Sequence, residues 1–148
     1  MDFPADPVRA EPPPAVPGLG VPVDWFGRGR DDVLIETADA GALRQITPDL
    51  SALAALASRA VIVTAAGDRP GVDCVSRVFA PNAGIAEDPV TGSAHCTLAG
   101  FWGRRLGRDE LVGEQASTRG GTVRMRPAGD RVVLAGQAVT VASITLHV

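Results

Sequence analysis

The chain contains no lysine and no tyrosine, and its fourteen basic residues are all arginines. Without lysine there is neither a Schiff-base nucleophile nor a Walker-type phosphate-binding loop, because both need the lysine amine. The net charge of −3 disfavours nucleic acid as a partner, since proteins that bind nucleic acids usually carry a basic surface. Three large functional classes are therefore excluded or disfavoured before any motif is considered.

Cysteine and histidine are scarce, with two of each. Cys74 and Cys96 lack C-x-x-C spacing, and two cysteines are too few for a disulfide framework. Together with His95 and His147 they supply too few ligands for a zinc site of the usual nitrogen and sulfur type. We expect no metal site.

Long apolar runs are also missing. The longest, residues 60–66 and 93–102, fall well short of the roughly 20 residues that a membrane-spanning helix needs. The first residues, MDFP followed by further prolines, do not resemble a secretory leader, which has a basic and then an apolar stretch. We expect a cytoplasmic protein with no membrane partner.

What is present fits one globular domain: 148 residues, of which 45% are apolar and 21% charged. Residues 1–20 are rich in proline, which excludes a helix and favours extended backbone. We therefore expect a strand end and linker over residues 1–20 and a domain over residues 21–148.

Within the domain, β-branched and apolar runs predict strands at residues 33–37, 60–64, 73–79, 117–126, 131–135 and 137–146. Thr47 followed by Pro48 is a typical helix start and predicts a helix that ends near Ser58. The paired glycines Gly120 and Gly121 suggest a bulge or a close backbone approach.

Residues 92–103 differ from their β-rich surroundings because they carry small or apolar side chains on every face. A helix without a polar face should be buried on all sides. Arg104 and Arg105, followed by Gly107, are typical of a helix C-terminus. The pattern predicts a buried helix among strands.

The segment just before this helix is the candidate site. The unpaired N–H groups at a helix N-terminus form a ready site for an anion. Gly92 lets a ligand approach the backbone, Thr91 and Ser93 can donate hydrogen bonds, and Asp88 can orient a substrate's amine or hydroxyl. The alternative is an ordinary capping segment with no ligand.

Three other residues have competing interpretations. Cys96 is either a core residue or a thiol base. His95 is either a satisfied buried histidine or a hydrogen-bond partner of Asp88 or of a neighbouring loop. Arg77 either pairs with a carboxylate on the inner face or is a solvated strand residue.

The run EDPVTGSAH at residues 87–95 closely resembles the signature of the PhzF-like phenazine-biosynthesis family. Four further segments resemble the family in the same order: MDFPA at residues 1–5, SRVFAP at 76–81, QASTRGG at 115–121 and VLAGQA at 133–138. The resemblance covers essentially the whole chain.

This resemblance implies an α+β fold of the diaminopimelate epimerase type, in which a β-barrel-like sheet wraps around a central buried helix. It implies a cofactor-independent isomerase or epimerase that moves a proton on a small cyclic or amino-acid-like carboxylate. Asp88 matches the catalytic aspartate, and Gly92 and Ser93 match the residues that hold the substrate carboxylate. Thr91 and His95 are further substrate-binding candidates.

The sequence departs from the family in one respect. The family's general acid/base is a glutamate near a Cys-Gly-His-Ala segment, which this sequence lacks. The chain therefore resembles a C-terminal half, and we expect it to pair with an N-terminal half or with a second copy of itself. The alternative is a catalytically inactive half that acts as a small-carboxylate binding or oligomerisation module.

Overall fold

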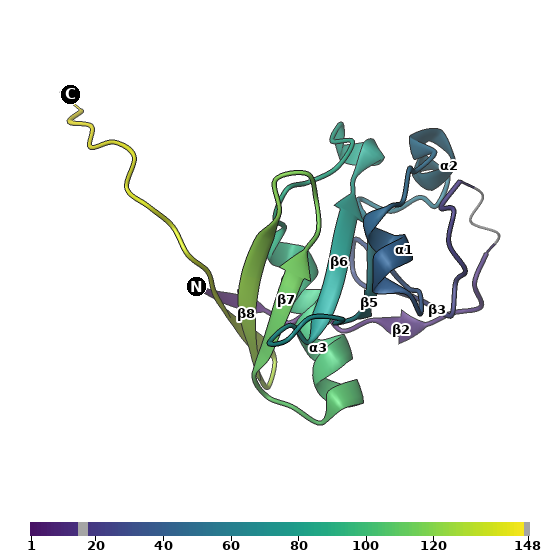
Figure 1. Cartoon of the computed structure of the whole chain (residues 1–148), viewed down its shortest axis with the longest axis horizontal. Coiled ribbons are helices and arrows are strands. Elements are labelled where there is room, and N and C mark those ends of the chain that lie inside the picture. The colour runs from purple at the N-terminus through teal and green to yellow at the C-terminus, as the bar shows by residue number, and fades with distance from the viewer. Residues whose placement is uncertain (15–17, 147–148) are drawn as a thin grey trace.

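The computed structural model describes residues 1–14 and 18–146, so Pro17 of the expected linker and His147 lie outside the described residues. Within these described ranges, nine strands form one mixed sheet in the order β1-β9-β8-β7-β6-β5-β4-β3-β2 (Figure 1). Two pairs are parallel, β4 with β5 and β6 with β7. The strands are β1 Asp2–Pro4, β2 Arg9–Ala10, β3 Trp25–Arg28, β4 Val33–Glu36, β5 Val61–Ala66, β6 Cys74–Phe79, β7 Leu111–Gln115, β8 Gly121–Ala128 and β9 Arg131–Ala135.

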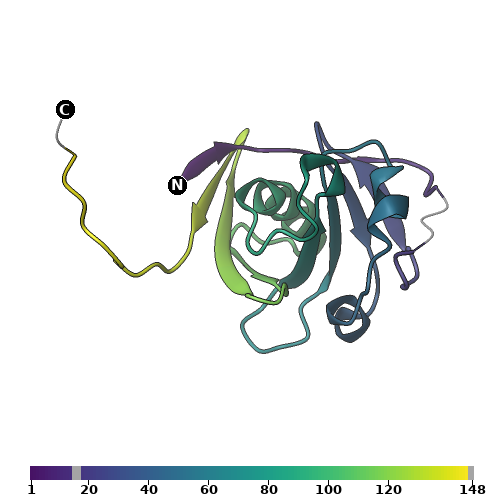
Figure 2. The same cartoon turned by 90° about the horizontal axis from the view of Figure 1, so that it is seen from above.

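The helices lie on both faces of this sheet. The sheet curves, and the long helix α3 (Gly92–Leu106) lies inside the curve, against β7, β8 and β9 (Figure 2). The short helix α1 (Ala40–Arg44) packs on the other side, against β5 and β6. The short helix α2 (Leu50–Ala54) contacts the 3-10 turn η1 (Pro81–Ala83).

Two hydrophobic cores follow from these layers. Side chains alternate along a strand, so Leu34 and Ile62 face the α3 core while Ile35 and Val63 face the core beneath α1 and α2. Both faces of β4 and β5 are therefore buried, which explains their continuous apolar sequences.

The N-terminal segment spans the open side of the curve. β1 pairs with β9 at one edge of the sheet, and β2 pairs with β3 at the other edge. Between them, residues 5–8 cross over α3 (Figure 2), where Asp6 accepts a hydrogen bond from Thr97 at 3.2 Å. The first twenty residues therefore contribute a strand to each edge, and β2 was not anticipated.

Most strand predictions are confirmed to within a few residues, but the predicted helix start is wrong. The helix α2 begins at Leu50, because the Asp49 carboxylate accepts hydrogen bonds from the N–H groups of Ser51 and Ala52. The left-handed backbone of Ala57, with φ 50°, lies beyond the end of the helix, before the expected boundary at Ser58. The strands β3 and β7 and the helix α1 were not anticipated.

The prediction of a strand at residues 137–146 is wrong. This segment is exposed, belongs to no strand and extends away from the body (Figures 1 and 2). Its apolar side chains are 82–89% exposed at Val139, Val141, Ile144 and Leu146. The physical reason is that a strand has two edges, and both edges of the preceding strand β9 are occupied, by β8 and β1.

Among the described residues, none of the helices is long and apolar enough to cross a membrane.

Candidate functional site

The helix α3 begins without a side-chain cap. In α1 and α2 the capping residues Asp39 and Asp49 each accept hydrogen bonds from two backbone N–H groups. At the start of α3 the capping residue Thr91 makes no such bond, and its hydroxyl donates to the Asp88 carboxylate. The N–H groups of the first turn therefore have no side-chain cap, at the positive end of the helix dipole.

Gln115 of β7 holds the loop that carries Asp88 and Thr91. Its side-chain amide donates to the Asp88 carbonyl at 2.6 Å and to the Thr91 hydroxyl at 3.1 Å. Its side-chain oxygen accepts the Thr91 N–H at 2.8 Å. Gln115 is fully buried, so these contacts are shielded from water.

The segment after Gln115 also hydrogen-bonds to the loop that carries Asp88 and Thr91. The Ser117 hydroxyl donates to the Pro89 carbonyl at 2.7 Å and accepts the Gly120 N–H at 3.0 Å. A Cβ atom on Gly121 would lie 2.5 Å from a methyl carbon of Val90. The close neighbour of Gly121 is therefore a side chain, where the paired glycines had suggested a bulge or a close backbone approach.

The structure brings four of the predicted site residues together. Asp88 and Thr91 are partly buried, whereas Gly92 and Ser93 are exposed at the surface of the first turn. The adjacent Glu87 does not join them, because Arg77 binds its carboxylate with two hydrogen bonds of 2.7 and 2.9 Å. Arg77 is buried and paired with a carboxylate, as one interpretation predicted, but its side chain lies on the face of β6 toward α1, where it donates to the Ile46 carbonyl, and not on the face toward α3.

The fifth predicted residue, His95, lies behind the site. Its side chain is fully buried, and its Nδ1 donates to the Thr91 carbonyl at 2.7 Å. Its Nε2 has no partner among the described residues and lies beside Gly113 of β7. His95 therefore supports the loop from the core: its side chain has no exposed surface for a ligand, and among the described residues it bonds to the Thr91 carbonyl and not to Asp88.

Burial lowers the pKa of His95, while its hydrogen bond to Thr91 acts in the opposite direction. In the unfolded chain the pKa of this histidine is near 6.5, and in the folded chain it lies below that value. As pH falls, the unfolded chain therefore takes up the proton before the folded chain does. We expect the free energy of unfolding to be highest above about pH 6.5 and to fall as pH drops through the folded-state pKa. Urea denaturation of the wild type and of His95→Asn from about pH 5 to 8 measures this; an identical pH dependence in both would contradict it.

Cys96 is 3% exposed. Burial, aided by the nearby Asp6 carboxylate, raises the pKa of its thiol. A thiol with a raised pKa remains protonated at neutral pH and is a poor base. The structure therefore favours the core interpretation of Cys96.

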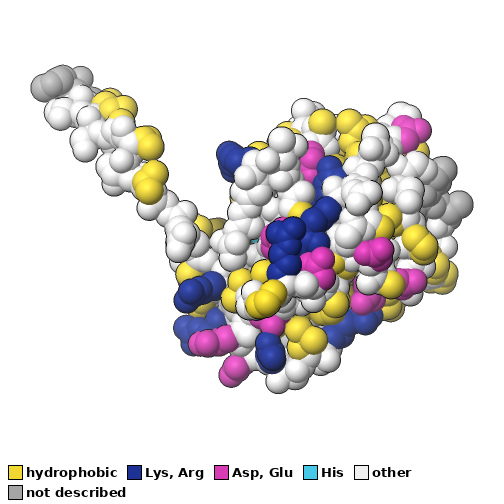
Figure 3. Space-filling view, in the orientation of Figure 1, with side chains coloured by type: hydrophobic (Ala, Val, Ile, Leu, Met, Phe, Trp, Pro, Cys, Tyr) yellow, Lys and Arg dark blue, Asp and Glu magenta, His cyan; other side chains and the backbone are white. Residues whose placement is uncertain are grey.

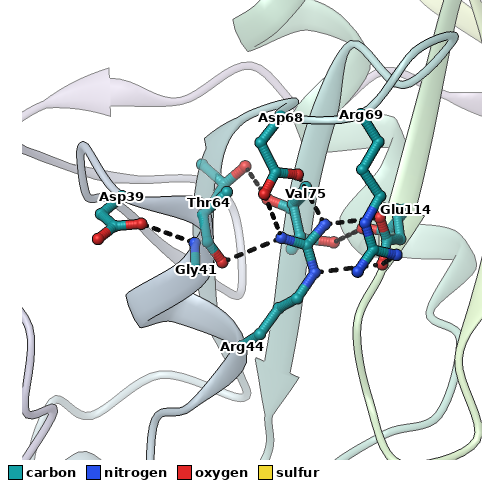
Figure 4. A network of polar contacts seen from close by, with 10 residues as sticks. Asp39, Gly41, Arg44, Thr64, Asp68, Arg69, Val75 and Glu114 are labelled. Carbon is teal, nitrogen blue, oxygen red and sulfur yellow. Dashed lines mark hydrogen bonds and ion pairs between the residues drawn. The ribbon is translucent and has the colours of Figure 1, made fainter.

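Glu114, next to Gln115 on β7, belongs to a network of ion pairs (Figure 4). Arg44 of α1 donates to Asp68 and to Glu114, both at 2.8 Å, and Arg69 donates to Glu114 at 3.3 Å. Figure 3 shows basic and acidic side chains gathered on this face, over β6 and β7. The network pairs opposite charges and so holds β7 in position next to Gln115.

Sequence reasoning missed two residues of the site. Gln115 lies in a segment that resembles the family, but nothing in its local pattern indicated a contact with Thr91, 24 residues away. The second is Arg59, whose Nη2 donates to the Ser93 hydroxyl at 3.0 Å across 34 residues of sequence. Within the described residues, no group of three or more His, Cys, Asp or Glu side chains is placed to hold a metal ion.

Comparison with known proteins identifies the class of protein to which this fold and loop belong. A family model described as phenazine biosynthesis-like protein matches residues 17–143. The chain therefore belongs to the phenazine biosynthesis-like (PhzC-PhzF) family.

The curated relatives include two uncharacterized isomerases. The chain is 41% identical over 144 residues to one from Halalkalibacterium halodurans, covering 95% of this chain and 54% of the relative. It is 49% identical over 126 residues to one from Pseudomonas aeruginosa, covering 84% of this chain and 47% of the relative. The chain thus spans about half the length of these relatives.

Solved structures of the family have the same mixed α+β fold. A PhzF-family protein from Enterococcus faecalis superposes with a TM-score of 0.89 at 40% identity, covering 96% of this chain and 55% of that chain. A PhzC/PhzF protein from Clostridium difficile superposes with a TM-score of 0.87 at 28% identity, covering 100% of this chain and 57% of that chain.

Proposed function

We propose that this chain acts as the C-terminal half of a PhzF-like isomerase or epimerase, which transfers a proton on a small cyclic or amino-acid-like carboxylate without a cofactor. The observation that carries the proposal is the uncapped start of α3 beside Asp88. In this proposal the N–H groups of Gly92 and Ser93 and the Ser93 hydroxyl hold the substrate carboxylate. Asp88, held by Thr91 and Gln115, orients the reacting part of the substrate.

The proposal includes an architecture: one half of a diaminopimelate epimerase-like protein, with a barrel-like sheet around a central helix. The curved sheet around α3 and the crossing of residues 5–8 over that helix support it. The buried His95 is given a supporting role, because it contacts Thr91 from within the core. A cytoplasmic location stays a prediction from the sequence.

The need for a second half is supported by residues 137–146. This segment carries no charged residue and is rich in β-branched side chains, as a paired strand would be. Four of its apolar side chains are more than 80% exposed, and exposed apolar surface of this kind typically marks an interaction site. The proposed partner is a polypeptide matching the other half of the relatives or, alternatively, a second copy of this chain.

A second candidate is a small-carboxylate binding module without catalysis. It is favoured because every group assigned to the anion site, including Gly92 and Ser93, lies within this chain. The two candidates share the site and differ only in whether a proton is moved.

We expect benzoate and anthranilate to shift the backbone NMR signals of Gly92 and Ser93 when titrated into the chain. Ser93→Ala should weaken this binding about tenfold, because it removes a hydrogen bond to a charged group. Thr118→Ala, which removes an exposed hydroxyl outside the site, is the matched control and should leave the affinity unchanged. Shifts centred elsewhere, or equal affinity in Ser93→Ala, would contradict the site.

Catalysis is tested separately. The chain is mixed with the part of the Halalkalibacterium relative that it does not match, and solvent deuterium entering amino-acid-like carboxylates is followed. Asp88→Asn should lower the rate by about 10²-fold, the usual loss when a substrate is no longer held in its reactive orientation. Asp109→Asn, an exposed aspartate beyond α3, is the control. Carboxylate binding without any deuterium exchange would favour the binding module.

A further inference from the structure

We propose that Arg59 is a positioning residue of the carboxylate site and acts by fixing the direction of the Ser93 hydroxyl. The inference rests on the proposed function, because it concerns the same anion site. Its starting point is the hydrogen bond of 3.0 Å from Arg59 Nη2 to Ser93 Oγ. Arg59 lies just before β5, and Ser93 lies in the first turn of α3.

A buried carboxylate fixes the Arg59 guanidinium in place. Asp32 is 2% exposed and accepts from Arg59 Nε at 2.9 Å and from Nη2 at 2.5 Å. It also accepts the backbone N–H of Ala60 at 3.1 Å. Two parallel hydrogen bonds between a guanidinium and a carboxylate fix the plane as well as the position of the arginine.

The sheet explains why this pair reaches α3. Asp32 immediately precedes β4, and Arg59 lies two residues before β5. These strands are parallel and in register, Val33 opposite Val61, so the residues that precede them emerge side by side at one end of the sheet. The start of α3 lies at that end, where Arg59 contacts Ser93.

The contact determines what the serine can do. A serine hydroxyl has one hydrogen to donate and two lone pairs that accept. Because the Arg59 N–H occupies a lone pair of Ser93, the hydroxyl hydrogen turns away from the guanidinium. No hydrogen bond among the described residues uses that hydrogen, so it is free to donate to a carboxylate. Arg59 thus makes Ser93 a donor at the site where the ligand needs one.

A double-mutant cycle separates this role from a merely structural one. Benzoate affinity is measured from the NMR signals of Gly92 in the wild type, Arg59→Met, Ser93→Ala and the double variant. If Arg59 acts through Ser93, each single change weakens binding about tenfold, and Arg59→Met has no further effect once Ser93 is alanine. An equal loss in both backgrounds would overturn the inference, since Arg59 would then act independently of Ser93.

Two controls accompany the cycle. Arg131→Met removes the same charge from an arginine of similar exposure, 44% against 47% for Arg59, paired with Asp2 on β1, and should leave benzoate affinity unchanged. If Arg59→Met unfolds because Asp32 is left buried and unpaired, the cycle is repeated with Arg59→Lys, which keeps a cation for Asp32 but lacks the planar fork that reaches both Asp32 and Ser93. Loss of affinity in Ser93→Ala but not in Arg59→Met overturns this inference alone; unchanged affinity in Ser93→Ala overturns the proposed site as well.

Discussion

Replacing Arg77 by methionine should lower the free energy of unfolding by about 3 kcal/mol, the low end of the cost of removing one partner of a buried ion pair, because the Glu87 side chain is 19% exposed. Arg77 is 9% exposed and binds the Glu87 carboxylate through two hydrogen bonds. It also donates to the Ile46 carbonyl at 2.6 Å, and its guanidinium lies 5.0 Å from the centre of the Phe79 ring. Methionine fills much of the space but leaves Glu87 without its cation and Ile46 without its donor.

Urea denaturation measures this loss, and two further variants test its cause. Glu87→Gln combined with Arg77→Met removes both charges and should recover part of the lost stability. Arg124→Met, an exposed arginine on β8, should change stability by no more than about 0.5 kcal/mol. A loss below about 1 kcal/mol in Arg77→Met would mean that the pair is effectively solvated.

The ion pair also matters for the site, because Glu87 directly precedes Asp88. Glu87 is held by Arg77 on β6, and the Asp88 N–H donates to the Val78 carbonyl on the same strand at 2.9 Å. These two contacts fix the loop to β6 just before α3 begins. We expect Arg77→Met to weaken benzoate binding even under conditions where the chain remains folded.

The parts of the fold that the sequence predicted are those where several local signals agree. The helix α3 combines an apolar sequence on every face with a left-handed glycine, Gly107, at its end. The strands β4 and β5 are continuous apolar runs because both of their faces are buried. Such features are set by residues close together in the sequence and by burial, and the apolar composition of each segment indicates how buried it is.

Features that depend on distant parts of the chain could not be predicted. The strand β7 contains Gly113, which weakens the strand signal, yet it is held between β6 and β8. Residues 137–146 have the composition of a strand, but strand formation needs a free edge, and the sheet offers none beside β9. Local propensity cannot indicate whether such an edge is available.

The same distinction applies to the candidate site. Asp88, Thr91, Gly92 and Ser93 are close in sequence, so one motif contains all of them. Gln115 on β7 and Arg59, two residues before β5, hold these residues in place, and no spacing rule connects the three segments. The roles of Gln115 and Arg59 therefore emerge only from the fold.

Replacing Gln115 by leucine should lower the free energy of unfolding by about 3 kcal/mol and abolish carboxylate binding at α3. Leucine has a similar volume but no polar atom, so the Asp88 carbonyl and the Thr91 N–H lose their partners in a partly buried site. Each unsatisfied buried group costs about 1–3 kcal/mol. Without these contacts, the loop that presents Asp88 and Thr91 is no longer fixed relative to α3.

Gln115→Glu separates the contribution of the accepting side-chain oxygen from that of the donating amide nitrogen. A carboxylate can still accept the Thr91 N–H, but it cannot donate to the Asp88 carbonyl, and it adds a negative charge near the Asp88 carboxylate. We expect it to retain more stability than Gln115→Leu and to bind benzoate more weakly than the wild type. Denaturation and NMR titration of the three proteins measure both quantities. If Gln115→Leu kept wild-type affinity, the carboxylate site would not depend on Gln115, and the contacts of the loop with β6 would be enough to fix it.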